Sequence, residues 1–292
     1  MRRPLVPLVP LLLCSGALHG APPGTEPETR VLEERKTRFQ TLLVVEEPAR
    51  RMRHLCGPGC GYVHGSIRLD EPDLLVPESL RTALVGLAFL AAPPKRVLVL
   101  GMGAGLVPRL LAGRYPSARV DVVEIDPEVP PLARRWFGFR DGPRLKVHVA
   151  DAADFVEEAR ATWDLVFLDA LFGPEVAPRL SGEPFLRAVR RRVAPGGVLV
   201  ANLSPPEVAV GTPALLRRLM ATGLSVRVFP TPGGASWITV ASDGPVDGEA
   251  LLARAAAVEE RLGAGYGLRE VLSRSAPRPP EGPGAATPVP PP

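Results

Sequence analysis

Three glycines and a set of acidic residues have the types and spacing of a nucleotide-binding site. Gly101, Gly103 and Gly105 follow directly after the apolar, β-branched run Val97–Leu100. Glycine lets the chain turn sharply and lets a ligand approach the backbone, and the N-terminus of a following helix offers free N–H groups. The sequence therefore predicts the strand, tight turn and helix of a nucleotide-binding βαβ unit.

Polar residues end each of the next predicted strands. Glu124 and Asp126 lie about 20 residues beyond the glycine loop, where such folds place a ribose-binding carboxylate. Asp151, Asp169 and Asn202 end the third, fourth and fifth strands. Ligands bind outside the carboxyl ends of the strands in an open parallel sheet, so we expect these side chains to meet in one nucleoside-sized site.

Each acidic residue suits a different task in such a site. Glu124 can accept hydrogen bonds from both hydroxyls of a ribose. Asp151 can accept from an adenine amino group, cap the helix that follows, or do both. Asp126 either caps the helix that starts at Pro127 or serves the ligand. Asp169 can orient or deprotonate an amine, which makes it the predicted catalytic residue.

Alternating strands and helices position these residues. The strands are continuous apolar runs, which indicates a parallel sheet covered on both faces. Leu224–Phe229 and Ala235–Ala241 are consecutive strands joined by a short turn, so they pair antiparallel. We predict an α/β fold: a doubly wound, mostly parallel seven-stranded sheet with a C-terminal antiparallel hairpin, preceded by a small N-terminal β lid. Helices are predicted over 77–90, 106–114, 129–136, 152–160, 184–193, 212–222 and 247–263.

The chain divides into five segments by composition. Residues 1–17 carry two arginines, a short apolar run and small residues, as in a secretory signal, with a disordered leader as the alternative. We expect a linker over 18–36, the small antiparallel β domain over 37–75, the nucleotide-binding domain over 76–265 and a disordered Pro-rich tail over 275–292. A real signal would imply an exported, periplasmic or secreted protein, and otherwise the protein would be cytoplasmic.

Cys56 and Cys60 flank a Gly-Pro-Gly turn. The turn would let the two sulfurs form a disulfide in an oxidising compartment, and two reduced thiols are the alternative. No metal is predicted, because zinc would need two further ligands and only His54 and His64 lie nearby.

The charge of the chain gives no sign of nucleic acid or membrane partners. The net charge is +4, and the arginines are spread over predicted helices without interleaved aromatic residues, which is typical of solvated helix faces. The apolar run near the N-terminus is too short to span a membrane.

Seven stretches of the sequence resemble one superfamily over about residues 37–242. It is the spermidine synthase (polyamine aminopropyltransferase) superfamily, together with its methyltransferase relatives, which include the C-terminal domain of the elongation-factor lysine methyltransferases. The stretches are Phe39-Gln40, Gly101-Met-Gly-Ala-Gly105, Val123-Glu-Ile-Asp126, Arg135-Trp-Phe-Gly-Phe139, Arg144-Leu-Lys-Val-His-Val-Ala-Asp-Ala152, Asp164-Leu-Val-Phe-Leu-Asp169 and Ala194-Pro-Gly-Gly-Val-Leu-Val-Ala-Asn202.

The resemblance implies the cofactor and its site. The cofactor would be S-adenosylmethionine or its decarboxylated form, and the acceptor an amine on a small molecule or a protein. Gln40, Glu124, Asp151 and Asp169 correspond to nucleoside-binding and catalytic positions. The predicted cofactor site is completed by Gly101, Gly103, Ala104, Gly105 and Ala152. The superfamily also implies a possible homodimer.

Three departures from the aminopropyltransferase pattern bear on the reaction. Ala104 stands where those enzymes have an acidic residue that binds the ammonium group of the cofactor. Val76-Pro77-Glu78 keeps only the glutamate of a Tyr-His-Glu stretch that contacts the polyamine, and Phe172 replaces a second acidic residue. A buried ammonium group left without partners costs about 1–3 kcal/mol or more, so spermidine synthesis is disfavoured.

We therefore expect methyl transfer to an amine, with Asp169 orienting the acceptor. The alternatives are aminopropyl transfer to an altered acceptor and a non-catalytic, exported relic of the fold. His54, His64 and Trp237 are candidates for the acceptor pocket, although a lone histidine in a hairpin is more often a surface residue and a tryptophan at a strand centre more often belongs to the core.

Overall fold

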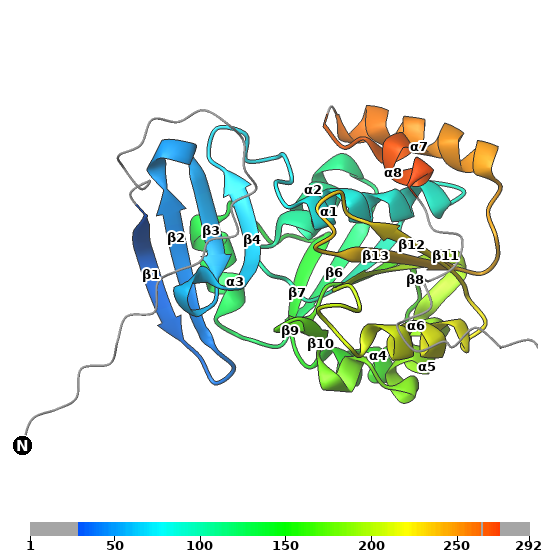
Figure 1. Ribbon diagram of the computed structural model, residues 1–292, viewed down its shortest axis with the longest axis horizontal. Coiled ribbons are helices and arrows are strands. Elements are labelled where there is room, and N and C mark those ends of the chain that lie inside the picture. The colour runs from blue at the N-terminus through cyan, green and yellow to red at the C-terminus, as the bar shows by residue number, and fades with distance from the viewer. Residues whose placement is uncertain (1–28, 264, 275–292) are drawn as a thin grey trace, which may run out of the picture.

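The computed structural model describes residues 29–263 and 265–274. In these ranges a four-stranded antiparallel sheet precedes a seven-stranded sheet that has helices on both faces (Figure 1). The predicted signal segment 1–17, most of the predicted linker and the predicted tail 275–292 lie outside the described residues.

The N-terminal sheet has four strands in the order β1-β2-β3-β4. They are β1 (Arg30–Lys36), β2 (Thr41–Glu47), β3 (Met52–Cys56) and β4 (Val63–Arg68), with the 3-10 turns η1 (Pro48–Arg50) and η2 (Pro58–Cys60) between them. The antiparallel lid is as predicted, but residues 30–36 of the predicted linker form its edge strand. A register shift between Val31 and Glu33 interrupts the alternation of β1, and its charged residues resemble a linker.

The seven-stranded sheet has the order β12-β13-β11-β8-β5-β6-β7. Its strands from β11 to β7 are parallel, and β13 pairs antiparallel with both β11 and β12, which confirms the predicted sheet and hairpin. The strands are β5 (Arg96–Leu100), β6 (Arg119–Glu124), β7 (Leu145–Val149), β8 (Trp163–Leu168), β11 (Val193–Leu203), β12 (Ser225–Pro230) and β13 (Trp237–Ser242). A separate two-stranded hairpin, β9 (Leu171–Phe172) and β10 (Glu175–Val176), was not predicted.

Helices cover both faces of this sheet (Figure 1). They are α1 (Glu78–Ala83), α2 (Leu106–Arg114), α3 (Val129–Trp136), α4 (Ala152–Glu158), α5 (Glu183–Arg192), α6 (Thr212–Met220), α7 (Gly248–Leu262) and α8 (Leu268–Ser273), with the 3-10 helices η3 (Leu84–Phe89) and η4 (Pro178–Leu180). Successive residues of β5 point to opposite faces: Val97 and Val99 pack with α2, α3 and α7, and Leu98 and Leu100 pack with α4, α5 and α6. The apolar run of β5 is therefore buried on both sides, as its sequence predicts.

Two details of the predicted elements differ from the structure. The helix expected over 77–90 is α1 followed by η3, and a Cβ at Gly86 would lie 2.2 Å from Cγ2 of Val200, so η3 lies directly against β11. The domain does not end at residue 265, because Leu268 and Val271 of α8 belong to its main core. None of the helices in the described part of the chain is long and apolar enough to cross a bilayer.

Candidate functional site

A cavity of about 380 Å³ lies between the N-terminal sheet and the carboxyl ends of β5, β6, β8 and β11. This volume is within the range of small-molecule sites, about 300–1,000 Å³. The seven-stranded side contributes the glycine loop, Glu124, Asp126, Asp169 and Asn202, and the N-terminal sheet contributes Phe39, Gln40, Tyr62 and His64. The structure thus brings together residues that lie more than 160 positions apart in the chain.

Two glycines of the loop have backbone conformations and neighbours that exclude a side chain. Gly101 has φ +93°, and a Cβ there would lie 2.2 Å from the carbonyl oxygen of Asp169. Gly103 has φ +50°, and its Cβ would lie 2.3 Å from the carbonyl oxygen of His64. The loop therefore contacts the end of β8 on one side and β4 of the N-terminal sheet on the other, as only glycine allows.

Ala104 does not face the main cavity. It is 2% exposed, and a Cβ at Gly65 would lie 2.6 Å from the Cβ of Ala104, so β4 packs directly over it. Ala104 lines only a void of about 10 Å³ beside the cavity, together with Asp169. The fourth position of the loop presents no polar side chain to a ligand.

Glu124 and Asp126 form a buried pair at the end of β6. The Glu124 carboxylate accepts hydrogen bonds from the backbone N–H of Met102 (2.9 Å) and of Asp126 (2.9 Å). Burial raises the pKa of Glu124, and these two hydrogen bonds act against it. Oδ1 of Asp126 accepts from the N–H of Glu128 (3.0 Å), whereas Oδ2 is buried without a partner among the described residues. Asp126 thus fixes the start of α3 and retains a free acceptor in a residue that lines the cavity.

Asp169 and Asn202 lie together at the ends of β8 and β11. Nδ2 of Asn202 donates to Oδ1 of Asp169 over 2.9 Å, and Oδ1 of Asn202 is buried without a partner in the part of the chain that the structure describes. The surrounding protein desolvates Asp169 and raises its pKa, and the hydrogen bond from Asn202 opposes this. A carboxyl group of raised pKa beside an unpaired amide oxygen can accept N–H groups from an amine.

The N-terminal sheet contributes a connected set of side chains to the cavity. Nε2–H of His64 donates to Oε1 of Gln40 over 3.0 Å, and the His64 ring lies edge-on to Tyr62 with 5.2 Å between centroids. Burial lowers the pKa of His64 and raises that of Tyr62, which the negative charge of Asp169 raises further. Tyr62 was missed from the sequence, although it stands two residues before His64, so that both lie on one face of the chain.

Asp151, Ala152 and Gly105 do not line the cavity. Asp151 caps α4 by accepting the N–H of Ala153 over 2.7 Å, which confirms the capping prediction, and its Oδ2 accepts from Nη1 of Arg179 over 2.6 Å. A Cβ at Gly105 would lie 2.5 Å from the Phe139 ring, so this glycine serves packing. The contact of Asp151 with an adenine stays a prediction.

Two of the three acceptor-pocket candidates also lie elsewhere. Nδ1 of His54 is 2.7 Å from Oγ of Ser66, within the N-terminal sheet, and Trp237 is buried in the core of the seven-stranded domain. His64 is therefore the candidate that the structure places at the cavity.

The structure pairs Cys56 and Cys60 in a disulfide. Gly57 and Pro58, inside the loop that the disulfide closes, line the cavity. The pairing therefore constrains part of the cavity wall.

Comparison with known proteins gives a consistent family. The model of the spermine/spermidine synthase domain matches residues 79–211. A polyamine aminopropyltransferase of Synechococcus sp. is 30% identical over 235 residues, covering 75% of this chain and 72% of the relative. One from Vibrio vulnificus is 31% identical over 179 residues, 60% of each protein.

Methyltransferases are among the relatives too. The bovine eEF1A lysine and N-terminal methyltransferase is 34% identical over 150 residues, which are 46% of this chain and 22% of that protein, so the chain spans only a part of its length. Among solved structures, a probable spermidine synthase from Corynebacterium glutamicum superposes with a TM-score of 0.67 at 25% identity, covering 81% of this chain and 88% of the other. Human methyltransferase-like protein 13 in complex with SAH gives a TM-score of 0.57 at 28% identity, covering 64% and 92%.

Proposed function

Since the chain belongs to the spermine/spermidine synthase family, whose relatives include both aminopropyltransferases and methyltransferases, we propose that it transfers a methyl group from S-adenosylmethionine to an amine. The observation that carries this proposal is Ala104. Position 104 is an alanine buried beneath β4, so the glycine loop carries no carboxylate that could pair with a decarboxylated cofactor's ammonium group or repel a cofactor carboxylate.

The cavity fits the nucleoside part of such a cofactor. Gly101 and Gly103 line the cavity, and Glu124, Asp126 and Gln40 offer acceptors for hydroxyl and amino donors. When bound, S-adenosylmethionine supplies an electrophilic methyl group on a sulfonium sulfur. The protein has to place the amine nitrogen in line with that methyl group and to accept the proton that the nitrogen loses.

Asp169 and Asn202 support this second task. Asn202 holds Oδ1 of Asp169 through its Nδ2, and its own Oδ1 is left to accept an N–H of the amine. Asp169 accepts the proton that leaves the nitrogen as it gains the methyl group. The raised pKa of Asp169 brings its proton affinity closer to that needed at neutral pH.

Calorimetry with two cofactors tests the proposal. We expect purified protein to bind S-adenosylmethionine more tightly than decarboxylated S-adenosylmethionine. Glu124→Ala should abolish binding of both, because the nucleoside loses its ribose acceptor and the loop loses the carboxylate that holds the N–H of Met102. Tighter binding of the decarboxylated form would contradict methyl transfer.

Aminopropyl transfer to an altered acceptor is the second candidate, and one observation favours it. Glu124, Asp126 and Asp169 line the cavity, and the described lining contains no lysine or arginine that would pair with a cofactor carboxylate. A preference for the decarboxylated cofactor in the same titration would select this reaction.

A non-catalytic, exported protein is the third candidate, supported by the Cys56–Cys60 disulfide. Mass spectrometry of protein from its native cells tests it. Cleavage near Ala17 together with the disulfide would favour export, whereas an intact Met1 with both thiols reduced would favour a cytoplasmic enzyme.

A further inference from the structure

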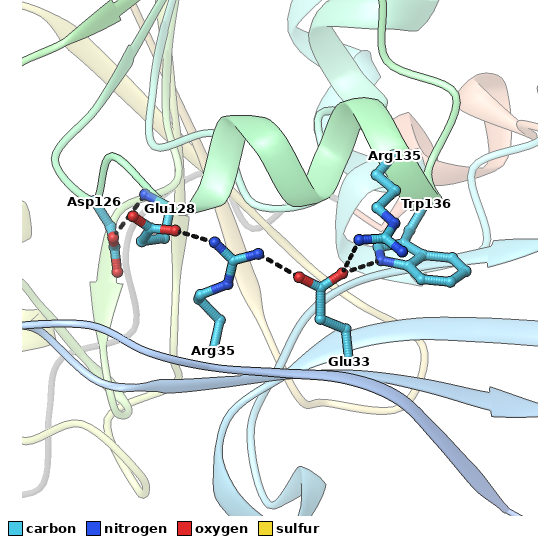
Figure 2. Close-up of polar contacts among 6 residues, drawn as sticks. All are labelled: Glu33, Arg35, Asp126, Glu128, Arg135 and Trp136. Carbon is cyan, nitrogen blue, oxygen red and sulfur yellow. Dashed lines mark hydrogen bonds and ion pairs between the residues drawn. The ribbon is translucent and has the colours of Figure 1, made fainter.

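The edge strand of the N-terminal sheet is attached to α3 by a set of polar contacts, which we call the β1–α3 contact (Figure 2). Glu33 of β1 accepts a hydrogen bond from Nε1 of Trp136 over 2.7 Å and lies 3.3 Å from Nη1 of Arg135. Its other oxygen accepts from Arg35 on the same strand. The Glu33 side chain is only 13% exposed, so its charge depends on these donors.

Arg35 extends the contact to the other end of α3. Its Nη1 donates to Oε2 of Glu128 over 2.6 Å, and the N–H of Glu128 donates to Asp126, whose carboxylate lines the cavity (Figure 2). Two side chains of β1 thus hold both ends of one helix. The contact reaches the wall of the cavity without any of its β1 residues lining it.

The same strand leads directly into the residues that the N-terminal sheet contributes to the cavity. The turn after β1 is closed by Thr37, whose Oγ1 accepts from the N–H of Phe39 and of Gln40, both over 3.0 Å. Phe39 and Gln40 line the cavity. Arg35 therefore lies beside the turn of the β1–β2 hairpin, and Gln40 stands at the end of that turn, five residues further on.

Another attachment of the N-terminal sheet, at the glycine loop, is of a different kind. At the glycine loop, β4 packs by close backbone approach, through Gly65 on Ala104 and the His64 carbonyl on Gly103. That contact fixes β4, which lies at the opposite edge of the sheet from β1. The β1 edge, and with it the hairpin tip, is held against α3 by the polar side chains of the β1–α3 contact.

We propose that Glu33 and Arg35 are positioning residues of the nucleoside site: by holding β1 on α3 they place Gln40 at the cavity, although neither touches the ligand. This inference rests on the proposed function in so far as the ligand is an S-adenosyl nucleoside. Arg35 acts through Glu128 and Glu33 acts through Trp136. The consequence is that nucleoside affinity depends on two residues outside the cavity.

The first test measures the affinity for S-adenosylhomocysteine by calorimetry in Arg35→Ala and in a matched control, Lys36→Ala. Lys36 is the next residue of β1 and is 81% exposed, with Glu34 at 4.0 Å as its partner. We expect Arg35→Ala to weaken binding about 3- to 10-fold, which corresponds to the loss of one modest hydrogen-bonded contact. Lys36→Ala should bind as the unmodified protein does.

A double-mutant cycle separates positioning from general destabilisation. If Arg35 acts by placing Gln40, then Arg35→Ala should have little further effect on affinity in a Gln40→Ala background. An Arg35→Glu, Glu128→Arg double variant should recover part of the affinity that Arg35→Glu alone loses. If Arg35→Ala weakens nucleoside binding equally in the unmodified protein and in the Gln40→Ala background, the proposal is overturned.

Hydrogen exchange without ligand keeps the inference separate from the proposed function. We expect Arg35→Ala, and not Lys36→Ala, to speed the exchange of backbone amides over residues 37–41. If the unmodified protein binds no S-adenosyl nucleoside, the proposed function fails. The exchange result still tests whether the β1–α3 contact holds residues 37–41 in place. Unchanged exchange in Arg35→Ala would contradict the inference even if binding of the nucleoside is intact.

Discussion

Glu33 in the β1–α3 contact and Asp169 in the cavity are both partly buried carboxylates, but their neighbours differ. Glu33 receives hydrogen bonds from Trp136 and Arg35 and lies beside Arg135, and these donors lower its pKa. Among the described residues Asp169 has one donor, the neutral amide of Asn202, and burial raises its pKa. The ionised form is favoured at Glu33 and disfavoured at Asp169.

Ionised Glu33 therefore stabilises the fold, whereas ionised Asp169 destabilises it. A lowered pKa means that Glu33 contributes stability above its ordinary value of 4.5 and that this contribution is lost as the pH falls below it. A raised pKa means that ionised Asp169 reduces stability as the pH rises above its ordinary value of 3.8. A costly charge in a cavity indicates a functional residue.

The largest effect is expected from Asp169→Asn. If Asp169 accepts the proton of the acceptor, the rate of S-adenosylhomocysteine release with a panel of primary amines should fall about 10²- to 10⁴-fold. The same change should raise the midpoint of thermal unfolding at pH 7, and the gain should shrink as the pH falls towards 3.8. If Asp169→Asn is less stable than the unmodified protein at pH 7, ionised Asp169 does not destabilise the fold, and the contrast with Glu33 is contradicted.

Gly65→Ala tests whether the N-terminal sheet packs directly on the glycine loop. The new Cβ would lie 2.6 Å from the Cβ of Ala104, so the free energy of unfolding should fall by about 1–3 kcal/mol. Denaturant unfolding measures this. Ala104→Gly in the same chain removes the clashing atom and should restore most of the loss, whereas the absence of rescue would place the strain elsewhere.

Glu33→Gln should reduce the free energy of unfolding at pH 7 by about 1–2 kcal/mol, because Trp136 and two arginines lose a charged acceptor. The loss should diminish as the pH falls from 4.5 towards the lowered pKa of Glu33, because the carboxyl group of the unfolded chain is protonated first. Glu34→Gln is the matched control, since Glu34 is 53% exposed and should change stability by less than about 0.5 kcal/mol. Equal pH profiles for the two variants would refute the role given to Glu33.

Trp136→Phe is the mildest change. It keeps an aromatic ring at the end of α3 but removes the Nε1 donor of Glu33, so we expect a loss of about 0.5–1.5 kcal/mol in unfolding free energy. The pKa of Glu33 should rise towards its ordinary value, which a pH series of unfolding measurements would detect. An unchanged profile would show that the arginines alone keep Glu33 ionised.

The seven-stranded sheet and the acidic residues at its strand ends could be predicted from the sequence for a physical reason. Strands buried on both faces are largely apolar, so β6 and β8 stand out, and Glu124 and Asp169 stand out at their ends against that background. The glycine loop could also be predicted from the sequence, since Gly101 and Gly103 occupy positions that exclude a side chain.

Contacts made by edge strands and distant turns were not accessible in this way. Glu33 and Arg35 of β1 contact α3 across 93 to 103 residues, and nothing within Arg30–Lys36 indicates these contacts. From the sequence, Asp151 is predicted to bind a ligand. In the structure its carboxylate is paired with Arg179, 28 residues further on. A pairing between remote positions leaves no local pattern, so β1 looked like a linker.

The packing of Gly65 on Ala104 also constrains how this protein can change over evolutionary time. Ala104 is almost fully enclosed beside a void of about 10 Å³, and the backbone of Gly65 fills the space above it. A longer side chain at position 104, such as a carboxylate, can be accepted only when β4 moves away from the loop. We therefore expect positions 65 and 104 to depend on each other, so that a larger residue at position 104 requires a second substitution in the N-terminal sheet.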